Sequence, residues 1–122
     1  MTTVRNIMST DLVTVERAAT IAEAATVMGE RGVGSALVVE GGRAVGIFTE
    51  RDVLRALASD FDAAHHRVEE WMTHDPIGVD ADASIGEARD LMLREGFRHL
   101  PVTEGGALVG IVSIRDLSRA ET

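Results

Sequence analysis

The chain has 122 residues, of which 45% are apolar, enough for one compact domain or two very small ones that share a core. Its net charge is −8, every cation is an arginine, and it has no cysteine, lysine or tyrosine. This composition excludes disulfides, cysteine-based zinc sites and lysine catalysis, and it disfavours nucleic acid as a partner.

The N-terminal segment MTTVRNIMSTD lacks the apolar stretch of a secretory signal. No segment approaches the roughly 20 apolar residues that a membrane span needs. An acidic surface is also a poor match for an anionic membrane. The sequence therefore predicts a soluble cytoplasmic protein with no membrane partner.

The chain contains a gapless internal repeat. A shift of 64 positions places residues 1–58 over residues 65–122, and 21 of the 58 pairs are identical. The polar stretch around residues 59–67 joins the two copies. Such a repeat predicts two units with the same local structure, so the elements are best taken for both copies together.

The first elements of each copy are a short strand and a helix. A lead-in strand is expected near residues 13–15 and again one repeat later. Thr20-Ile-Ala-Glu23 and Ser84-Ile-Gly-Glu87 are capping boxes, which mark helix starts. Apolar residues then recur at helical spacing, and both helices are expected to end near Gly32 and Gly96.

Each helix is followed by a predicted hairpin and a second helix. Two short apolar runs flank Glu-Gly-Gly, and a Gly-Gly pair between such runs is typical of a tight hairpin. A unit this small buries only one face of its sheet, so we expect an α+β fold of two β-α-β-β-α repeats. We further expect them to be packed sheet to sheet with pseudo-twofold symmetry. The hairpin strands are predicted at 36–39, 44–48, 100–103 and 108–112, and the second helices at 50–58 and 114–120.

The end of each hairpin carries a repeated polar pattern. Residues 46–52 read GIFTERD, here called the first-repeat motif, and residues 110–116 read GIVSIRD, the second-repeat motif. With the lead-ins Met8-Ser-Thr and Met72-Thr-His-Asp-Pro, these motifs resemble a tandem pair of CBS domains, the Bateman module. The resemblance covers essentially the whole chain, with one repeat at 1–58, a linker at 59–67 and a second repeat at 68–122.

The resemblance implies a regulatory protein that binds adenosine nucleotides (AMP, ADP or ATP) in clefts between its repeats. In the family the motif hydroxyl meets phosphate or ribose, the aspartate accepts bonds from the ribose hydroxyls, and the lead-in strand borders the adenine. Carried over to this chain, these positions are Thr49 and Asp52 in the first motif, Ser113 and Asp116 in the second, and Leu12, Val13, Pro76 and Ile77 in the lead-ins.

The residues themselves support this chemistry but leave a second interpretation open. A helix start offers free N–H groups to a phosphate, Arg51 and Arg115 add forked donors, and a carboxylate suits a vicinal diol. Thr-x-x-Asp at a helix start is also a capping box, however, and such a box needs no ligand. The two roles are compatible, and both copies use Asp where the chain's other boxes use Glu.

The two predicted sites are unequal. Arg98 and His99 of the second copy replace Gly34 and Ser35 of the first. These two residues either add positive charge beside a phosphate or are solvated surface residues. In the first case the second copy holds the tighter site. His65, His66 and His74 lack metal-ligand spacing and are interpreted as linker residues, so no metal is expected.

Three functions remain as hypotheses. The first is a stand-alone nucleotide sensor that acts on an unidentified regulated protein; the second is a structural dimerisation scaffold with empty clefts. The third is a sensor of S-adenosylmethionine, another ligand of the family. The chain lacks a nucleophile–base set, so we predict that it is not an enzyme and requires no cofactor. By the family resemblance, it is expected to form a homodimer through its helices.

Overall fold

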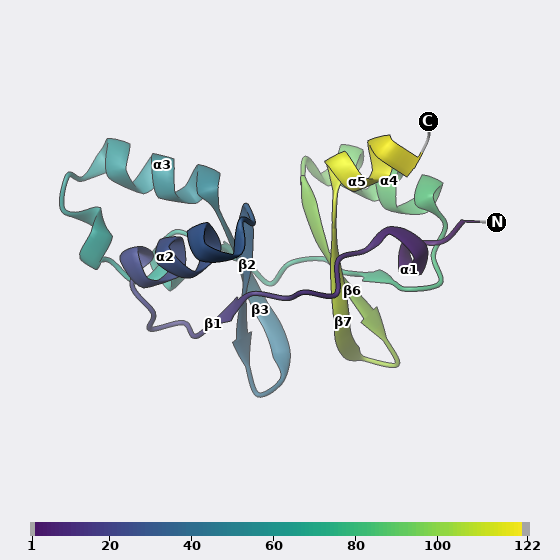
Figure 1. The fold of residues 1–122 in the computed structure, drawn as a ribbon, viewed down its shortest axis with the longest axis horizontal. Helices are drawn as coiled ribbons and strands as arrows, with labels where there is room; N and C mark the ends of the chain where they lie inside the picture. Colours follow the sequence, from purple (N-terminus) through teal and green to yellow (C-terminus); the bar gives the residue numbers. More distant parts are fainter. Residues whose placement is uncertain (1, 121–122) are drawn as a thin grey trace. The chain divides into compact units, whose positions relative to one another are not determined.

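The computed structural model describes residues 2–120 and confirms the mixed α+β class, with two sheets and five α-helices among these residues (Figure 1). The predicted order of strand, helix, strand, strand and helix is confirmed in both copies. The first copy contains β1 (Thr14–Val15), α2 (Ile21–Arg31), β2 (Ser35–Glu40), β3 (Arg43–Thr49) and α3 (Glu50–Ser59). The second contains β5 (Val79–Asp80), α4 (Ile85–Glu95), β6 (His99–Glu104), β7 (Ala107–Ser113) and α5 (Ile114–Ala120).

Short elements in the segments that precede the lead-in strands β1 and β5 were not predicted. The first such segment forms the one-turn helix α1 (Val4–Ile7). The second forms two 3-10 turns, η1 (Ala63–His65) and η2 (Val68–Glu70), followed by the two-residue strand β4 (Thr73–His74). Ala63 is fully buried, so part of the polar stretch between the copies is packed into a core.

The chain divides into two compact units whose limits differ from those of the sequence repeats. The central unit is Val13–Pro76. The terminal unit combines the residues up to Leu12 with those from Ile77 onward. The segment that precedes each lead-in strand therefore packs into the unit that contains the other copy's hairpin. The alignment of the two copies cannot reveal this exchange.

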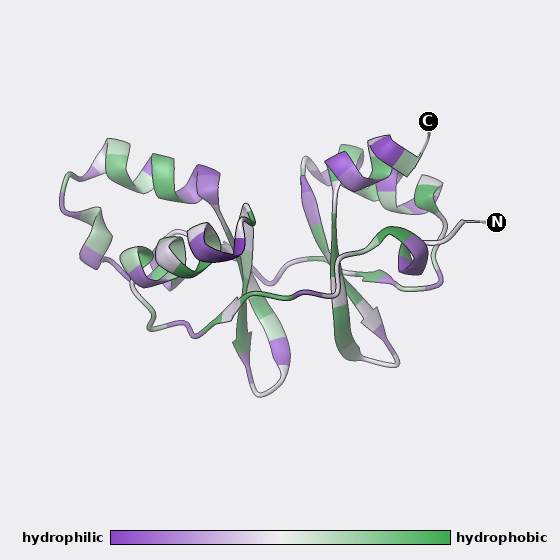
Figure 2. Cartoon of the chain, in the orientation of Figure 1, coloured by the Kyte–Doolittle hydropathy of each residue, from purple (hydrophilic) through white to green (hydrophobic). Residues whose placement is uncertain are grey.

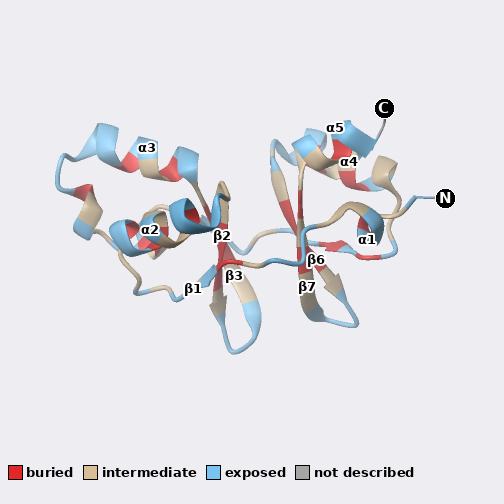
Figure 3. Cartoon of the chain, viewed as in Figure 1, coloured by how far each residue is buried: buried red, intermediate tan, exposed pale blue. Residues whose placement is uncertain are grey.

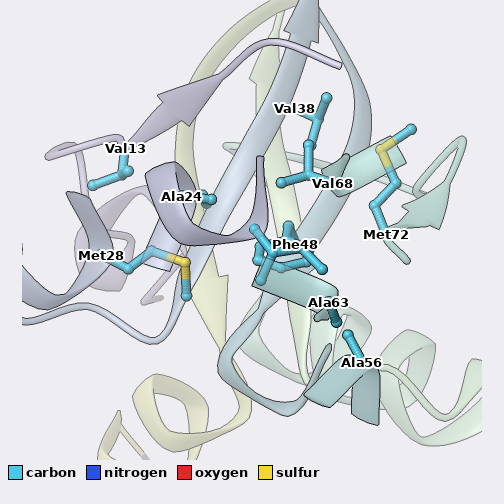
Figure 4. Packing of buried hydrophobic residues seen from close by; sticks show 11 residues of the cluster. Val13, Ala24, Met28, Val38, Phe48, Ala56, Ala63, Val68 and Met72 are labelled. Carbon is cyan, nitrogen blue, oxygen red and sulfur yellow. The ribbon is translucent and has the colours of Figure 1, made fainter. Parts of the chain in front are cut away.

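The central unit is built on a four-stranded sheet in the order β1-β2-β3-β4. Strand β1 runs parallel to β2, whereas β2–β3 and β3–β4 are antiparallel. Helices α2 and α3 contact β2 and β3, and the residues between sheet and helices form one core cluster. Figure 4 shows Phe48, which is fully buried, in the middle of this cluster beside Val68.

The terminal unit repeats this plan with a three-stranded sheet in the order β5-β6-β7. Helices α4 and α5 contact β6 and β7. A single bridge between Ser9 and Ile111 lies at the position that β4 occupies in the central unit. The hairpins of both units have the same register, including an irregularity at Val38/Val39 and at Val102/Thr103.

The exchanged segments explain why each motif begins with a glycine, Gly46 or Gly110. Val68 and Met72 belong to the core of the central unit, and Val4 and Met8 pack in that of the terminal unit. A Cβ atom on Gly46 would collide with the Met72 side chain, and one on Gly110 would lie 2.6 Å from the Met8 sulfur. Real Cβ atoms do not come this close to a neighbour, so glycine lets the exchanged methionine lie against the strand.

The predicted helix and hairpin ends follow the expected backbone chemistry. Thr20 and Ser84 cap α2 and α4, which end at Gly32 and Gly96 in the left-handed conformation. Both glycines of each Glu-Gly-Gly turn have positive φ, as a two-residue hairpin loop requires. These local signals position β3 and β7. The last residue of each strand, Thr49 or Ser113, lies directly before the helix of its motif, α3 or α5.

The hydropathy and burial patterns agree within each unit. Apolar residues follow the strands and the helix faces that contact them (Figure 2), and the buried residues lie there too (Figure 3). Large apolar side chains that remain exposed include Leu54, Leu57 and Phe61, at and just after α3, and Leu93 of α4.

Candidate functional site

The first-repeat motif forms a strand-to-helix junction in the central unit. Thr49 ends β3 and is the N-cap of α3. The Asp52 N–H donates to Thr49 Oγ1 at 3.3 Å, and Asp52 Oδ2 accepts from the Thr49 N–H at 2.9 Å and from its hydroxyl at 3.1 Å. The motif is therefore a reciprocal capping box in which Asp takes the place of the usual Glu.

Asp52 is held on its other side by an arginine. Its Oδ1 accepts from Arg55 Nη1 at 2.8 Å, and the carboxylate group is almost entirely buried, with the residue 6% exposed. The Arg55 guanidinium in turn lies over the ring of Trp71, 5.6 Å from its centroid. Asp52 thus accepts from three donors, so the capping interaction and the arginine leave about one of its roughly four acceptor positions.

Trp71 continues this polar chain away from the motif. Its Nε1–H donates to His66 Nδ1 at 3.3 Å, and His66 Nε2 lies 2.9 Å from Asp60 Oδ2. A neutral imidazole with its proton on Nε2 satisfies both contacts. Trp71 therefore packs against the core and also links Arg55 to the segment after α3.

The second-repeat motif has the same backbone arrangement in the terminal unit. Ser113 ends β7; its Oγ accepts from the Asp116 N–H at 3.1 Å, and its own N–H donates to Asp116 Oδ2 at 2.9 Å. Asp116 is partly exposed, in contrast to the buried Asp52. The Asp116 carboxylate is accordingly the more accessible acceptor of the two.

The residue pair at the start of each preceding strand lies beside its motif. Ser35 pairs with Thr49 and His99 pairs with Ser113 across the two hairpins. The next backbone bonds run from Glu50 N–H to the Gly34 carbonyl at 3.0 Å and from Ile114 N–H to the Arg98 carbonyl at 2.9 Å. Arg98 and His99 thus lie next to the second-repeat motif and within the same unit.

The lead-in residues lie where the chain passes between the two units. It leaves the terminal unit after Leu12 and returns to it at Ile77, so the pairs Leu12–Val13 and Pro76–Ile77 are each divided by the boundary. Val13 is a core residue of the central unit, and its carbonyl accepts from the Leu37 N–H at 2.8 Å. Ile77 remains 41% exposed. Val13 can therefore meet a ligand only with its backbone or a small part of its surface.

Sequence reasoning missed the network around Asp52. The Asp52–Arg55 pair was accessible in principle, because residues three apart on a helix are neighbours. The contacts of Arg55 with Trp71 and of Trp71 with His66 depend on tertiary packing, which no local pattern encodes. Among residues 2–120, no group of three or more His, Cys, Asp or Glu side chains is arranged to hold a metal ion.

Comparison with known proteins identifies the family. The CBS domain family matches residues 4–59 and 68–122. An uncharacterized 17.7 kDa protein of Acidianus ambivalens is 47% identical over 98% of this chain and 73% of its own length. The crystal structure of the CBS-domain containing protein ATU1752 from Agrobacterium tumefaciens superposes with a TM-score of 0.91 at 32% identity, covering 99% of this chain and 100% of that one.

The chain belongs to the CBS domain family, as a tandem pair of CBS domains. No catalytic family is indicated. Two similar structures contain adenosine compounds. The CBS domain pair of MJ0100, in complex with 5′-methylthioadenosine and S-adenosyl-L-methionine, is 28% identical over 99% of this chain and 96% of that one, with a TM-score of 0.89. CBSX2, in complex with AMP, is 25% identical over 99% of this chain and 96% of that one, with a TM-score of 0.82. Proteins of this architecture thus serve as ligand-binding regulatory modules. Among the described residues, no helix is long and apolar enough to cross a bilayer.

Proposed function

We propose that this chain is a non-catalytic sensor that binds AMP, ADP or ATP through its two motifs and signals to a protein that it regulates. The observation that carries the proposal is the aspartate at the third helical position of both motifs. A single Oδ2 accepts the N-cap N–H in each case, at 2.9 Å. A carboxylate offers about four acceptor positions, so a capping Asp116 can still accept from both hydroxyls of a ribose, whereas Asp52, which also accepts from Arg55, has about one position left for a ribose hydroxyl.

The roles of the remaining residues follow from their chemistry. Asp116 and Asp52 accept from the ribose hydroxyls, and Ser113 and Thr49 face the ribose or the phosphate. A phosphate needs donors and positive charge, which Arg51 and Arg115 supply at the exposed side of their helices. Arg98 and His99 add to this in the terminal unit, while Ser35 adds a hydroxyl in the central one. The adenine lies against Leu12 and Val13 at one site and against Pro76 and Ile77 at the other.

The AMP complex of CBSX2 supports a nucleotide as the ligand. A second candidate, S-adenosylmethionine or 5′-methylthioadenosine, is favoured by the MJ0100 complex. Neither compound has a phosphate: 5′-methylthioadenosine has no anionic group, and S-adenosylmethionine offers only the carboxylate of its methionyl end to Arg98 and Arg115. Arg115 of the second-repeat motif and the neighbouring Arg98 are therefore the reason to place nucleotides first.

A thermal-shift screen tests the proposal. AMP, ADP and ATP are compared with S-adenosylmethionine, and GTP serves as the control for the adenine. Ligand at 100 times its Kd should stabilise the folded protein by about 2.7 kcal/mol. A rise in Tm with adenosine nucleotides and none with GTP is expected. No shift with any adenosine compound at millimolar concentration would favour the alternative of a scaffold with empty clefts.

We also propose that the protein forms a homodimer through exposed apolar side chains at α3. Leu54 and Leu57 are 69% and 46% exposed and lie three residues apart on one helix face, and Phe61, just after the helix, is 94% exposed. Such a stripe is more apolar than a solvated helix face needs to be. A second copy of this chain would bury it.

Light scattering at micromolar concentration tests the dimer. The unsubstituted chain should have twice the monomer mass, and the double variant Leu54→Glu, Leu57→Glu should be monomeric with unchanged helical circular dichroism. Leu93→Glu on α4 is the matched control for a charge placed on an exposed leucine. A monomeric mass for the unsubstituted protein would contradict the proposal.

A further inference from the structure

The two motifs differ in what lies at the first helical residue. In the central unit the Glu50 side chain folds back over Gly34. A Cβ atom added to Gly34 would lie 3.1 Å from Glu50 Oε1 and 3.3 Å from Cδ. The backbone holds the same two residues together, since the Glu50 N–H donates to the Gly34 carbonyl at 3.0 Å. Gly34 and Glu50 are therefore a matched pair: the missing side chain of one makes room for the carboxylate of the other.

The terminal unit has the opposite pair at the matching positions. Ile114 takes the place of Glu50 and packs against the core cluster, and Arg98 takes the place of Gly34. The same backbone bond joins them, from Ile114 N–H to the Arg98 carbonyl at 2.9 Å. The two units thus share the backbone arrangement. Where the central unit has Glu50 next to Gly34, the terminal unit has Ile114 next to Arg98.

The charge around the two motifs consequently differs by two units, since Arg55 and its match Arg119 are common to both copies. At the matched positions the first-repeat motif carries two carboxylates, Glu50 and Asp52, and one cation, Arg51. The second carries one carboxylate, Asp116, and one cation, Arg115, and Arg98 lies beside it as a second cation. Ionised carboxylates and phosphates both only accept hydrogen bonds, so a phosphate placed beside Glu50 meets repulsion and gains no bond in return.

We propose that Glu50 is a specificity-determining residue that disfavours phosphate at the first-repeat motif. The central unit then prefers an adenosine compound without a phosphate, and the terminal unit prefers the nucleotide. This inference rests on the proposed function, because it assigns different ligand classes to the two motifs of the same protein. Glu50 is exposed and its side chain is flexible, so it weakens phosphate binding and does not abolish it.

The test measures AMP and adenosine, which differ only in the phosphate, by calorimetry in two single-site backgrounds. Asp116→Ala leaves the first-repeat motif as the working site. Asp52→Asn loses the charge and half of the acceptors of the first-repeat motif, so that the second motif dominates, while it retains a polar side chain at the capping position. In the Asp116→Ala background AMP should bind about tenfold more weakly than adenosine, equivalent to about 1.4 kcal/mol. In the Asp52→Asn background AMP should be the tighter ligand.

Substitution of Glu50 then isolates its role. Glu50→Gln in the Asp116→Ala background should bring AMP to the affinity of adenosine and leave adenosine unchanged. Glu16→Gln, which removes the same charge from the loop after β1, is the matched control and should change neither ligand. The reciprocal variant Arg98→Gly, Ile114→Glu in the Asp52→Asn background should weaken AMP at least about tenfold, or about 1.4 kcal/mol, with adenosine retained.

The outcomes distinguish this inference from the proposed function. An AMP-to-adenosine ratio that Glu50→Gln does not change would overturn the assignment of Glu50 and leave nucleotide binding intact. No binding of either compound by the unsubstituted protein would overturn the proposed function, and this inference with it.

Discussion

The central and terminal units share a backbone plan and differ in the side chains around their motifs. In the central unit Asp52 is buried and paired with Arg55 at 2.8 Å, and Glu50 lies over Gly34. In the terminal unit Asp116 is partly exposed, with Arg98 in the place of that glycine. Duplication has thus preserved the capping geometry while the surrounding charge has diverged. We therefore expect the ligand preference of each motif to follow these differences in charge and not the shared capping residues.

The largest loss of stability should come from substitution at a core position where the two copies have side chains of different size, Phe48 and Val112. Phe48→Ala removes a fully buried ring from the central unit and should cost about 3–5 kcal/mol of unfolding free energy. The matching Val112→Ala deletes two buried methyl groups and should cost about 2 kcal/mol. Urea denaturation measures both. Equal losses would mean that the two cores depend equally on this position.

The next effect concerns the phosphate end of the second-repeat motif. Arg98→Ala should weaken AMP by about 1.5–3 kcal/mol, the range for a hydrogen bond to a charged group, and leave adenosine nearly unchanged. Calorimetry with both compounds measures the difference. Equal losses for AMP and adenosine would show that Arg98 does not contact a phosphate.

The two aspartates should differ in their contribution to stability. Asp116→Ala removes a capping acceptor and should cost about 1 kcal/mol of unfolding free energy. Asp52→Ala also removes the ion pair with Arg55, which is half-exposed and adds less than about 1 kcal/mol. Denaturation with no ligand present measures these values. A larger loss for Asp116→Ala would contradict the view that Asp52 is the more structural of the pair.

The smallest change in stability should come from Arg5 and Arg17, which form ion pairs with glutamates at the hairpin turns. Arg5 contacts Glu104 at 2.6 Å and Asp82 at 3.0 Å, and hydrogen bonds to these two carboxylates raise its pKa. Arg17 contacts only Glu40, also at 2.6 Å, among the ion pairs of the described residues. Arg5→Ala should lower Tm slightly more than Arg17→Ala, with both changes small because the groups are solvated. High salt should remove the difference; a difference that persists would show that packing, and not charge, is responsible.

Much of the fold follows from local signals that the sequence contains twice. The capping box at Thr20, the N-cap at Ser84, the left-handed glycines at the helix ends and the Gly-Gly turns were predicted correctly, because each depends on a few adjacent residues. At Ser84 the hydroxyl accepts from the Glu87 N–H, which is one half of the box that the sequence predicts. The exchange of Val4 and Met8 with Val68 and Met72 could not be predicted in this way. At the offset of 64, Val4 aligns with Val68 and Met8 with Met72, and this alignment is the same whether each pair packs in its own copy's core or in the other's.

The candidate site was predictable only in part for the same reason. The motif residues are marked by their repetition, and the difference between Arg98 and Gly34 is visible in the alignment of the copies. That Glu50 lies over Gly34 depends on a side-chain direction, and the contact of Arg55 with Trp71 depends on packing between distant segments. Sequence spacing determines neither.

The most direct test of nucleotide binding through the two motifs is a calorimetric titration of AMP into the unsubstituted protein and the double variant Asp52→Ala, Asp116→Ala. Each lost charge-assisted hydrogen bond to the ribose should cost on the order of 1.5–3 kcal/mol, so the double variant should lose measurable AMP binding while its circular dichroism stays that of a folded protein. The single variant Asp116→Asn should fall between, because an amide keeps the size and loses half of the acceptors. Unchanged AMP affinity in the double variant would contradict the account and leave the two motifs as helix caps alone.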